Sequence, residues 1–326
     1  MNIFKDILCV VDIREDCAAA LERAVTLAEN NQASLTVLDV VDRITAGIGM
    51  PDGGPISADL QSAIVAADMQ ALEELVDPYR KRVSIKVAVR KGTRFMETIR
   101  QVLTNGHDLV IKVTEKLDWF DRLFGCDDMN LLRECPCPVW VVKPQIKKSY
   151  RVILAAVDTD DGYPRAELSS RDAVNREILE IACSLALSDF AELHVVHAWQ
   201  AIGESAMRGA LMHTPEIKII NYVEQVRRQR EIKLNRVVHE VTSQLGKGAA
   251  EYLNPQIHLI KGGARKEIPE LAEQLKADVI VMGTVARTGV PGFIMGNTAE
   301  TILNQINCSV LAIKPSEFKT PVTLED

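Results

Sequence analysis

Short apolar runs alternate along this chain with longer segments that indicate helices. Residues 6–12 (DILCVVD) and 152–158 (VILAAVD) are two such runs, both rich in Val, Ile and Leu and both ending in Asp. Runs of this kind are typical of buried parallel strands. Their regular alternation with helices predicts parallel sheets that are covered on both faces and joined by right-handed crossovers.

The second half of the chain repeats the first. The segment CPVWVVKP at 137–144 matches CSVLAIKP at 308–315, and a strand ending at Gly92 matches one ending at Gly263, both at an offset of 171 residues. Near-constant spacing of matched segments is the sequence signature of a duplicated unit. We therefore predict two tandem domains, at 1–146 and 147–318, and a polar tail at 319–326.

The apolar runs and the segments between them predict the same element order twice. Besides the first strands, we expect strands at 34–41, 192–198, 278–282 and 309–313, and helices at 17–31, 58–76, 175–188 and 220–245. Each half is thus α/β, a Rossmann-like domain with a five-stranded parallel sheet. The polar composition after Pro315 predicts a partly disordered tail.

A glycine-punctuated loop lies between a strand and a helix in the second half. Residues 278–315 read DVIVMGTVARTGVPGFIMGNTAETILNQINCSVLAIKP, in which glycines at 283, 289, 292 and 296 separate the strand from a helix that begins at about Thr298. Glycines at such a junction let backbone N–H groups approach a phosphate, and the helix dipole favours the anion.

This loop resembles the nucleotide loop of the universal stress protein family. Its ATP-binding members carry Gly-x-x-Gly, nine residues, then Gly and Ser or Thr. Gly283 and Gly296 match the first and third glycines at the family's spacing, whereas Ala286 and Asn297 depart from the pattern. The flanking GTVARTG and GNTAE are similar to the tandem, E-type members of the family.

The resemblance implies an adenine nucleotide alpha hydrolase-like fold with ATP as the cofactor of the second domain. It implies a site with an Asp at the end of the first strand, a Val against adenine near the end of the second strand, and the phosphates on the glycine loop. The residues that occupy or adjoin these places are Asp158, Val195, Gly283, Arg287, Gly296, Asn297 and Thr298. Capping of the following helix is the alternative role for Asn297 and Thr298, and a solvated loop charge is the alternative for Arg287.

The first half lacks this loop. Lys112 and Val113 stand at the matching places, and only Gly125 remains, as the partner of Gly296. Asp121, Asp127 and Asp128 would repel a triphosphate at a helix start unless a metal ion intervened. We expect no nucleotide site in this half.

Composition narrows the function further. The net charge of −7 argues against nucleic acid as a partner. No run approaches the length of a membrane helix, no export signal is visible, and the odd count of seven cysteines is typical of a reducing compartment. We therefore expect a cytoplasmic protein.

Other candidate chemistry is weaker. Cys135-Pro136-Cys137 is one residue shorter than a redox Cys-x-x-Cys, and we expect it to end a helix before a strand. His194 and His197 point to opposite faces of their predicted strand, which indicates structural roles. No metal-ligand spacing, nucleophile elbow or P-loop is present.

The sequence therefore predicts a regulatory binding module for stress resistance that holds an adenine nucleotide, and not an enzyme. Slow ATP hydrolysis is a weaker alternative. A second alternative is an apolar or lipid-like metabolite bound by the second-domain crevice and segment 206–220, because Met207, Leu211 and Met212 suit adaptable apolar sites. We also expect the last strands of the two halves to pair within the chain as a pseudo-dimer, with a homodimer as a further option.

Overall fold

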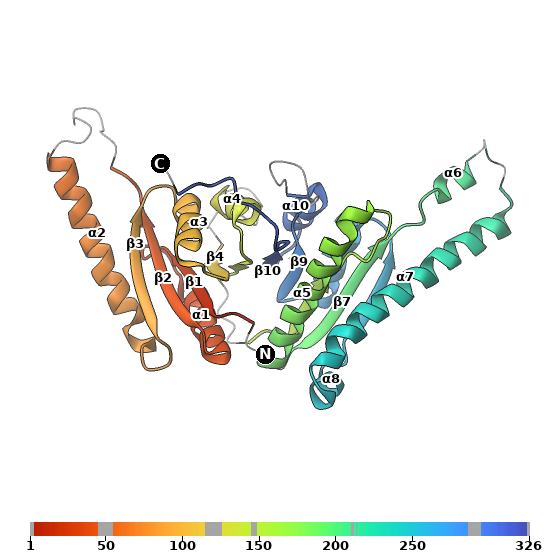
Figure 1. Ribbon diagram of the computed structural model, residues 1–326, viewed down its shortest axis with the longest axis horizontal. Helices are drawn as coiled ribbons and strands as arrows, with labels where there is room; N and C mark the ends of the chain where they lie inside the picture. The colour runs from red at the N-terminus through yellow and green to blue at the C-terminus, as the bar shows by residue number, and fades with distance from the viewer. Residues whose placement is uncertain are drawn as a thin grey trace. The chain divides into compact units, whose positions relative to one another are not determined.

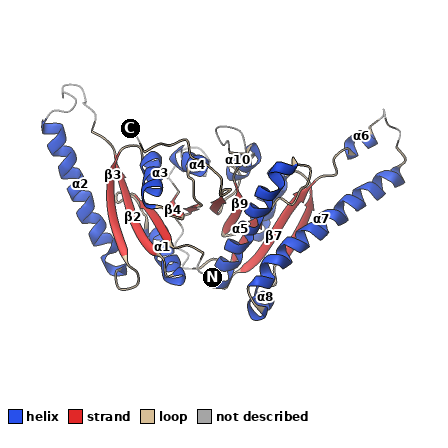
Figure 2. Cartoon of the chain, viewed as in Figure 1, coloured by secondary structure: helices blue, strands red, loops and turns tan. Residues whose placement is uncertain are grey.

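The computed structural model describes residues 3–44, 55–114, 126–144, 149–209, 212, 214–285 and 295–324. The chain forms two compact units, each an α/β layer structure (Figures 1 and 2). The first unit contains β1 to β5, α1 to α4, and also β10 with the residues after it. The second contains β6 to β9 and α5 to α10.

The sheet of the first unit has the strand order β3-β2-β1-β4-β5-β10. All neighbours run parallel except β10, which pairs antiparallel with β5. The strands are β1 (Asp6–Val11), β2 (Ser34–Val41), β3 (Ile85–Lys91), β4 (Leu109–Val113), β5 (Val139–Val142) and β10 (Ser309–Ile313). The predicted pairing of the two final strands within one chain is thus present.

Helices cover both faces of this sheet. They are α1 (Ala18–Asn31), α2 (Pro55–Val76), α3 (Arg94–Asn105) and α4 (Cys126–Glu134), with a short 3-10 helix at Asp77–Tyr79. Helix α1 packs on β1, β2 and β4, helix α2 packs on β2 and β3, and α3 packs on α4. Right-handed crossovers set α1 and α2 on one face and α3 and α4 on the other.

The second unit repeats this plan with four parallel strands in the order β9-β6-β7-β8. The strands are β6 (Val152–Ala156), β7 (Glu192–Trp199), β8 (Gln256–Lys261) and β9 (Val279–Gly283). The helices are α5 (Arg165–Asp189), α6 (Glu204–Arg208), α7 (Glu216–Gln244), α8 (Lys247–Leu253), α9 (Ala264–Leu275) and α10 (Asn297–Leu303). Helices α5 and α7 contact each other, as do α9 and α10.

The duplication and the α/β fold are confirmed. Strand β1 lies between β2 and β4, as β6 lies between β7 and β9, so the first strands of the two repeats are equivalent central strands. The domain limits at 146 and 318 stay a prediction, because residues 145–148 lie outside the described part of the chain. One element differs between repeat and unit: β10 belongs to the second repeat by sequence and to the first unit by structure.

The tail after Pro315 is more ordered than its polar composition predicts. Phe318 is only 6% exposed, and the Nζ atom of Lys314 lies 4.4 Å from the centre of its ring. Further along, Arg100 Nε of α3 donates a hydrogen bond to the carbonyl oxygen of Thr323 at 3.1 Å. The described tail, up to residue 324, therefore packs on the first unit.

Among the described helices, none combines the length and the apolar content that crossing a bilayer requires.

Candidate functional site

The carboxyl ends of β6 and β9 lie side by side in the second unit. Their parallel register ends with Ala156 beside Met282, so the chain beyond these strands places Asp158 level with Thr284. Strand order reverses around β6, since β7 lies on one side of it and β9 on the other. In open parallel sheets, ligands bind at such a switch point. The structure thus brings together two of the predicted site positions, Asp158 and Gly283.

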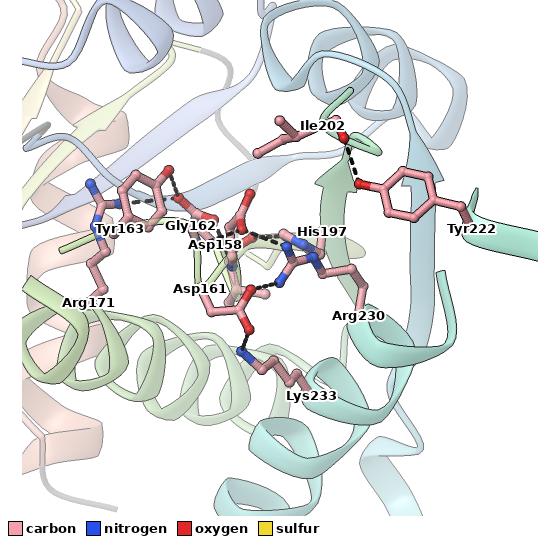
Figure 3. Close-up of polar contacts among 12 residues, drawn as sticks. Asp158, Asp161, Gly162, Tyr163, Arg171, His197, Ile202, Tyr222, Arg230 and Lys233 are labelled. Atoms are coloured by element: carbon pink, nitrogen blue, oxygen red, sulfur yellow. Dashed lines mark hydrogen bonds and ion pairs between the residues drawn. The ribbon is translucent and has the colours of Figure 1, made fainter. Parts of the chain in front are cut away.

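The Asp158 carboxylate is already partly engaged (Figure 3). Its Oδ2 atom accepts hydrogen bonds from Tyr163 Oη at 2.7 Å and from the Arg171 guanidinium at 3.2 Å, and its Oδ1 atom accepts from the Asp160 backbone N–H at 3.1 Å. The Asp158 side chain is nevertheless 44% exposed. Because a carboxylate offers about four acceptor positions, the contacts within the described residues leave about one open.

Tyr163 and Arg171 form a lid-like pair over one side of this carboxylate. The Arg171 guanidinium lies 3.4 Å from the centre of the Tyr163 ring, a cation–π contact, and also faces Glu167 at 3.6 Å. Burial, with the nearby Asp158 charge, raises the pKa of the Tyr163 phenol, which therefore stays a hydrogen-bond donor. This pair was not predicted from the sequence.

Two further acids tie the same loop to α7. Arg230 contacts Asp160 at 2.8 Å and also pairs with Asp161, which in turn accepts a hydrogen bond from Lys233. The hydrogen bonds from Lys233 and Arg230 lower the pKa of Asp161 to about 2. The acidic run after β6 is thus a fixed loop and not a free acidic surface.

His197 and Trp199 are buried on one side of β7 close to this loop. His197 is 2% exposed, and its Nδ1 donates to the carbonyl of Val157 at 3.2 Å, which leaves Nε2 as an acceptor. Burial lowers the pKa of His197, so the ring is neutral. Neither His197 Nε2 nor Trp199 Nε1 has a hydrogen-bond partner within the residues that the structure describes. His194 lies three residues before His197 on β7, and therefore on the opposite face of the sheet, as predicted. Its Nδ1 atom is hydrogen-bonded to Nε2 of His258 at 2.9 Å.

Val195 does not lie at the carboxyl edge. It has no exposed surface, and β7 continues to Trp199, four residues beyond it. A ligand at the edge would meet the end of β7 and not the side chain of Val195. The position of Val195 near the strand end was therefore misjudged from the sequence.

Gly283 ends β9 close against α5. A Cβ atom on Gly283 would lie 3.1 Å from Val174 Cγ1 of α5. The next residue, Thr284, is 1% exposed, and its hydroxyl has no partner among the described residues. Its carbonyl oxygen accepts the Gly296 N–H at 3.0 Å, which closes the base of the loop. Ala286 and Arg287 lie outside the described residues.

The start of α10 differs from the predicted cap. Gly296 is the N-cap residue, with φ −64° and ψ 132°, and no side chain caps the helix. Asn297 and Thr298 lie in the first turn and are exposed. The Thr298 hydroxyl accepts a hydrogen bond from Arg265 Nε at 3.5 Å, so a cation from α9 stands at the entrance of α10. Capping by Asn297 or Thr298 was wrong, because the helix begins one residue earlier.

In the first repeat, charged side chains of the chain itself occupy the positions equivalent to the candidate site. Asp12, which matches Asp158, accepts a hydrogen bond from Arg94 at 2.6 Å. Although burial works against it, this bond and the Arg14 N–H lower the pKa of Asp12. Arg94 matches Arg265, which in the second repeat reaches Thr298 instead.

A buried ion pair occupies the loop position of the first repeat. Lys112 of β4 pairs with Asp128 of α4, whose side chain has no exposed surface. We expected Asp128 to repel a triphosphate at a helix start. Instead its charge is compensated inside the fold, which corrects that prediction. Residues 115–125, including Gly125, lie outside the described part.

No group of three or more metal-ligating side chains capable of holding an ion occurs in the described ranges.

Comparisons with known proteins agree with this architecture. A sequence model of the universal stress protein family matches residues 3–143 and again residues 149–314. Universal stress protein E of Escherichia coli strain K12 is 29% identical over all of this chain and 99% of its own length. The protein of the same name from Photorhabdus laumondii is 28% identical, over 99% and 98% of the two chains.

Solved structures give the same fold. A Pseudomonas aeruginosa PAO1 protein of unknown function is 25% identical, with a TM-score of 0.65 over 97% of this chain and 94% of its own. A universal stress protein from Archaeoglobus fulgidus, 17% identical, has a TM-score of 0.61 over 95% and 98% of the chains. With two family matches that together span nearly the whole sequence, this chain belongs to the universal stress protein family, as a tandem member.

Proposed function

We propose that this chain is a regulatory binding protein whose second unit holds an adenine nucleotide at the carboxyl ends of β6 and β9. The proposal rests mainly on Asp158. Its carboxylate is half exposed and fixed by Tyr163 and Arg171, and it keeps about one acceptor position open. An exocyclic amino group such as that of adenine is a donor that fits this position.

The phosphates of such a ligand would extend toward α10. Asn297 and Thr298 in its first turn are exposed, and Arg265 beside Thr298 supplies a positive charge. The buried hydroxyl of Thr284 adds a donor at the base of the loop. Arg287 belongs to the same proposal by sequence.

Isothermal titration of the full chain with ATP and Mg²⁺ tests this proposal. The Asp158→Asn variant should bind at least about tenfold more weakly, since a hydrogen bond to a charged group contributes about 1.5–3 kcal/mol. Asp12→Asn is the matched control, because Asp12 occupies the same place in the first repeat and is bound to Arg94. Absence of binding by the unaltered chain, or equal weakening by both variants, would contradict the nucleotide site.

We further propose that binding, and not turnover, is the activity of this site. Among the described residues near Asp158, Asp160 and Asp161 are held in ion pairs with Arg230 and Lys233, and the imidazole of His197 is buried. Asp158 itself would be occupied by the ligand, so none of these groups is poised to activate water. Phosphate release from ATP by the purified chain should equal that of a protein-free blank. A rate above the blank that Asp158→Asn abolishes would establish an ATPase instead.

A second candidate function has its own observation. Exposed apolar side chains gather before and at the start of α7: Ile202, Met212, Ile217 and Ile220 are 50–72% exposed. Tyr222 Oη donates to the Ile202 carbonyl, and Arg208 bridges Glu204 and Glu216, so α6 is tied to α7 beside them. An apolar or lipid-like metabolite would suit such a surface.

Native mass spectrometry of the chain purified without detergent tests this second candidate. A co-purifying apolar molecule that is lost in the Ile217→Ser/Ile220→Ser variant would support it. A chain that carries no such molecule, and that takes up no fatty acid from solution, would exclude it.

A further inference from the structure

Two thiols lie in contact inside the first unit. The Sγ atoms of Cys135 and Cys137 are 3.6 Å apart, and the two residues are 0% and 8% exposed. Helix α4 ends at Glu134 and β5 begins at Val139, so the Cys-Pro-Cys segment joins a helix to a strand as its sequence predicts. The chain bends at Pro136 and Cys137, which turns both sulfurs to the same side.

A lysine from the last strand reaches the same place. The antiparallel register pairs Ala312 with Val139, and two residues further it sets Lys314 opposite Cys137. Lys314 is 3% exposed, and its Nζ donates to the carbonyl oxygens of Leu132 and Arg133, both at 2.7 Å. It therefore covers the carbonyl end of α4, next to Cys135.

The surroundings favour a thiolate on Cys135. Burial opposes the charged form, but the hydrogen bonds from Cys137 and the charge of Lys314 outweigh it and lower the pKa of Cys135. The bond to Cys135, together with burial, raises the pKa of Cys137. Burial lowers the pKa of Lys314 to about 8, so the ammonium is still charged at neutral pH.

We propose that Cys135 and Cys137 form an oxidation-sensitive dithiol that hydrogen peroxide converts to a disulfide. The Cys135 thiolate attacks one peroxide oxygen, so that an S–O bond forms, the O–O bond breaks and hydroxide leaves. The Cys137 sulfur then attacks the sulfenic sulfur of Cys135, an S–S bond forms, and the S–O bond breaks with loss of a second hydroxide. The two thiol protons convert both hydroxides to water, and two electrons pass from sulfur to peroxide.

The geometry makes this bond accessible by a small movement. The sulfurs must approach from 3.6 Å to about 2.05 Å. Since Cys137 lies two residues before β5, between α4 and the strand that pairs with β10, oxidation would alter the junction of these three elements. The dithiol thus lies at the one place where the end of the second repeat joins the described sheet of the first unit.

The second repeat provides a matched control. Cys308 stands where Cys137 stands in the first repeat, at the offset of 171, but Ile306 replaces Cys135. Cys308 is also buried, at 5% exposure, and a single thiol cannot form this bond. Peroxide should therefore change the Cys135–Cys137 pair and leave Cys308 as a thiol.

Peptide mapping after peroxide treatment of the folded full chain tests the proposal. Trypsin releases a peptide that begins at Glu134 and contains only these two cysteines. Because it does not cleave before Pro315, it releases another from Thr288 to Lys319 that contains only Cys308. The first should lose about 2 Da, two hydrogens, and recover them with dithiothreitol. A first peptide with two alkylatable thiols after treatment, or equal oxidation of Cys308, would overturn the proposal.

Variants separate the effect of Lys314 on the reactivity of Cys135 from its effect on folding. Lys314→Met should slow disulfide formation roughly three- to tenfold, the effect of half to one pKa unit in the attacking thiol. Lys143→Met, at the equivalent position of the first repeat, should not. In the unaltered chain the rate should also rise with pH between 6 and about 8 as the thiolate forms. A rate independent of both pH and Lys314 would refute the assigned chemistry even if Lys314→Met folds poorly.

Discussion

Gly283 ends β9 directly against α5. Substituting alanine for it tests how tightly the strand and the helix pack. In Gly283→Ala the new methyl would lie 3.1 Å from Val174 Cγ1, and a helical valine has little freedom to rotate away. We expect the free energy of unfolding to fall by about 0.5–1.5 kcal/mol.

Gly248 of α8 is the control for this substitution, because no atom lies within 4 Å of the Cβ that Gly248→Ala would add. That variant should be more stable by about 0.5–1 kcal/mol, the usual gain in a helix. Urea unfolding of both variants measures the difference. Equal effects at the two positions would mean that Val174 yields without cost.

Glu177 on α5 predicts a pH dependence of stability. Burial, with the charge of Glu180, raises the pKa of Glu177 to about 7. Between its ordinary value of 4.5 and about 7 the folded chain keeps a proton that the unfolded chain releases, so this group's contribution to stability falls as pH rises through that window. Glu177→Gln should therefore stabilise the chain by about 1–3 kcal/mol at pH 8 and by much less at pH 4.5.

Asp172 lies on the same helix but is exposed, so Asp172→Asn should change stability by less than about 0.5 kcal/mol at either pH. Thermal unfolding at both pH values measures the two variants. A gain for Glu177→Gln that is the same at pH 4.5 and 8 would contradict the raised pKa.

Single residues of the site were predictable only where the backbone fixes them. Asp158 and Gly283 end adjacent parallel strands, and the apolar runs in the sequence set those ends. The engagement of Asp158 by Tyr163 and Arg171 depends on the fold of a short loop and on a side chain from the next helix. No local pattern reports such a contact. Val195 was misplaced because strand length, and not the alternation within the strand, decides which residue reaches the edge.

Strands were predicted more accurately than helix starts. The apolar runs at 34–41 and 309–313 coincide with β2 and β10, because buried parallel strands are apolar along their whole length. Helix α5 begins at Arg165 and not near 175, and α7 begins at Glu216 and not at 220. In these first turns Ile219 is buried, but Arg165, Glu216 and Lys218 are exposed, so the apolar pattern is weak there. The signals that remained were Pro164 and Pro215, the residues at the two N-caps.

The ion pair between Lys112 and Asp128 joins β4 to α4 and predicts a large effect of breaking it. Lys112→Met would remove the cation that pairs with the fully buried Asp128, and breaking a buried pair from one side costs about 3–5 kcal/mol. Lys112→Met/Asp128→Leu should recover most of this loss, since an apolar pair needs no compensation. Guanidinium unfolding of the single and double variants tests both expectations.

The control is the exposed pair of Arg208 and Glu216, whose side chains are 46% and 60% exposed. Arg208→Met should cost less than about 1 kcal/mol. If Lys112→Met is as mild as Arg208→Met, the buried pair does not hold α4 on the sheet.

The two repeats have kept one fold and given its carboxyl edge different chemistry. In the first, Arg94 binds the aspartate that ends β1, and Lys112 pairs with Asp128 where the loop would begin. In the second, the equivalent arginine, Arg265, reaches the first turn of α10, and the Asp158 carboxylate is 44% exposed. The duplication could be predicted from sequence because strand and spacing patterns survive this divergence. The ion pairs could not, because each joins residues that are distant in sequence.

The end of the chain should stabilise the unit built by its beginning. Phe318 is 6% exposed and lies under Lys314, and it belongs with β10 to the first unit although it follows the second repeat. Phe318→Ala should therefore destabilise the first unit by about 3–5 kcal/mol, the range for truncating a buried phenylalanine. Leu324 is 60% exposed, so Leu324→Ala is the control and should lower the free energy of unfolding by less than about 0.5 kcal/mol.

Hydrogen exchange resolves where the effect of Phe318→Ala falls. Amides of β4 and β5 should exchange faster in this variant, because the first unit opens more often, whereas amides of β6 and β7 should keep their rates. The same acceleration in both sets would mean that the chain unfolds as one cooperative body. Acceleration confined to β6 and β7 would refute the assignment of the tail to the first unit.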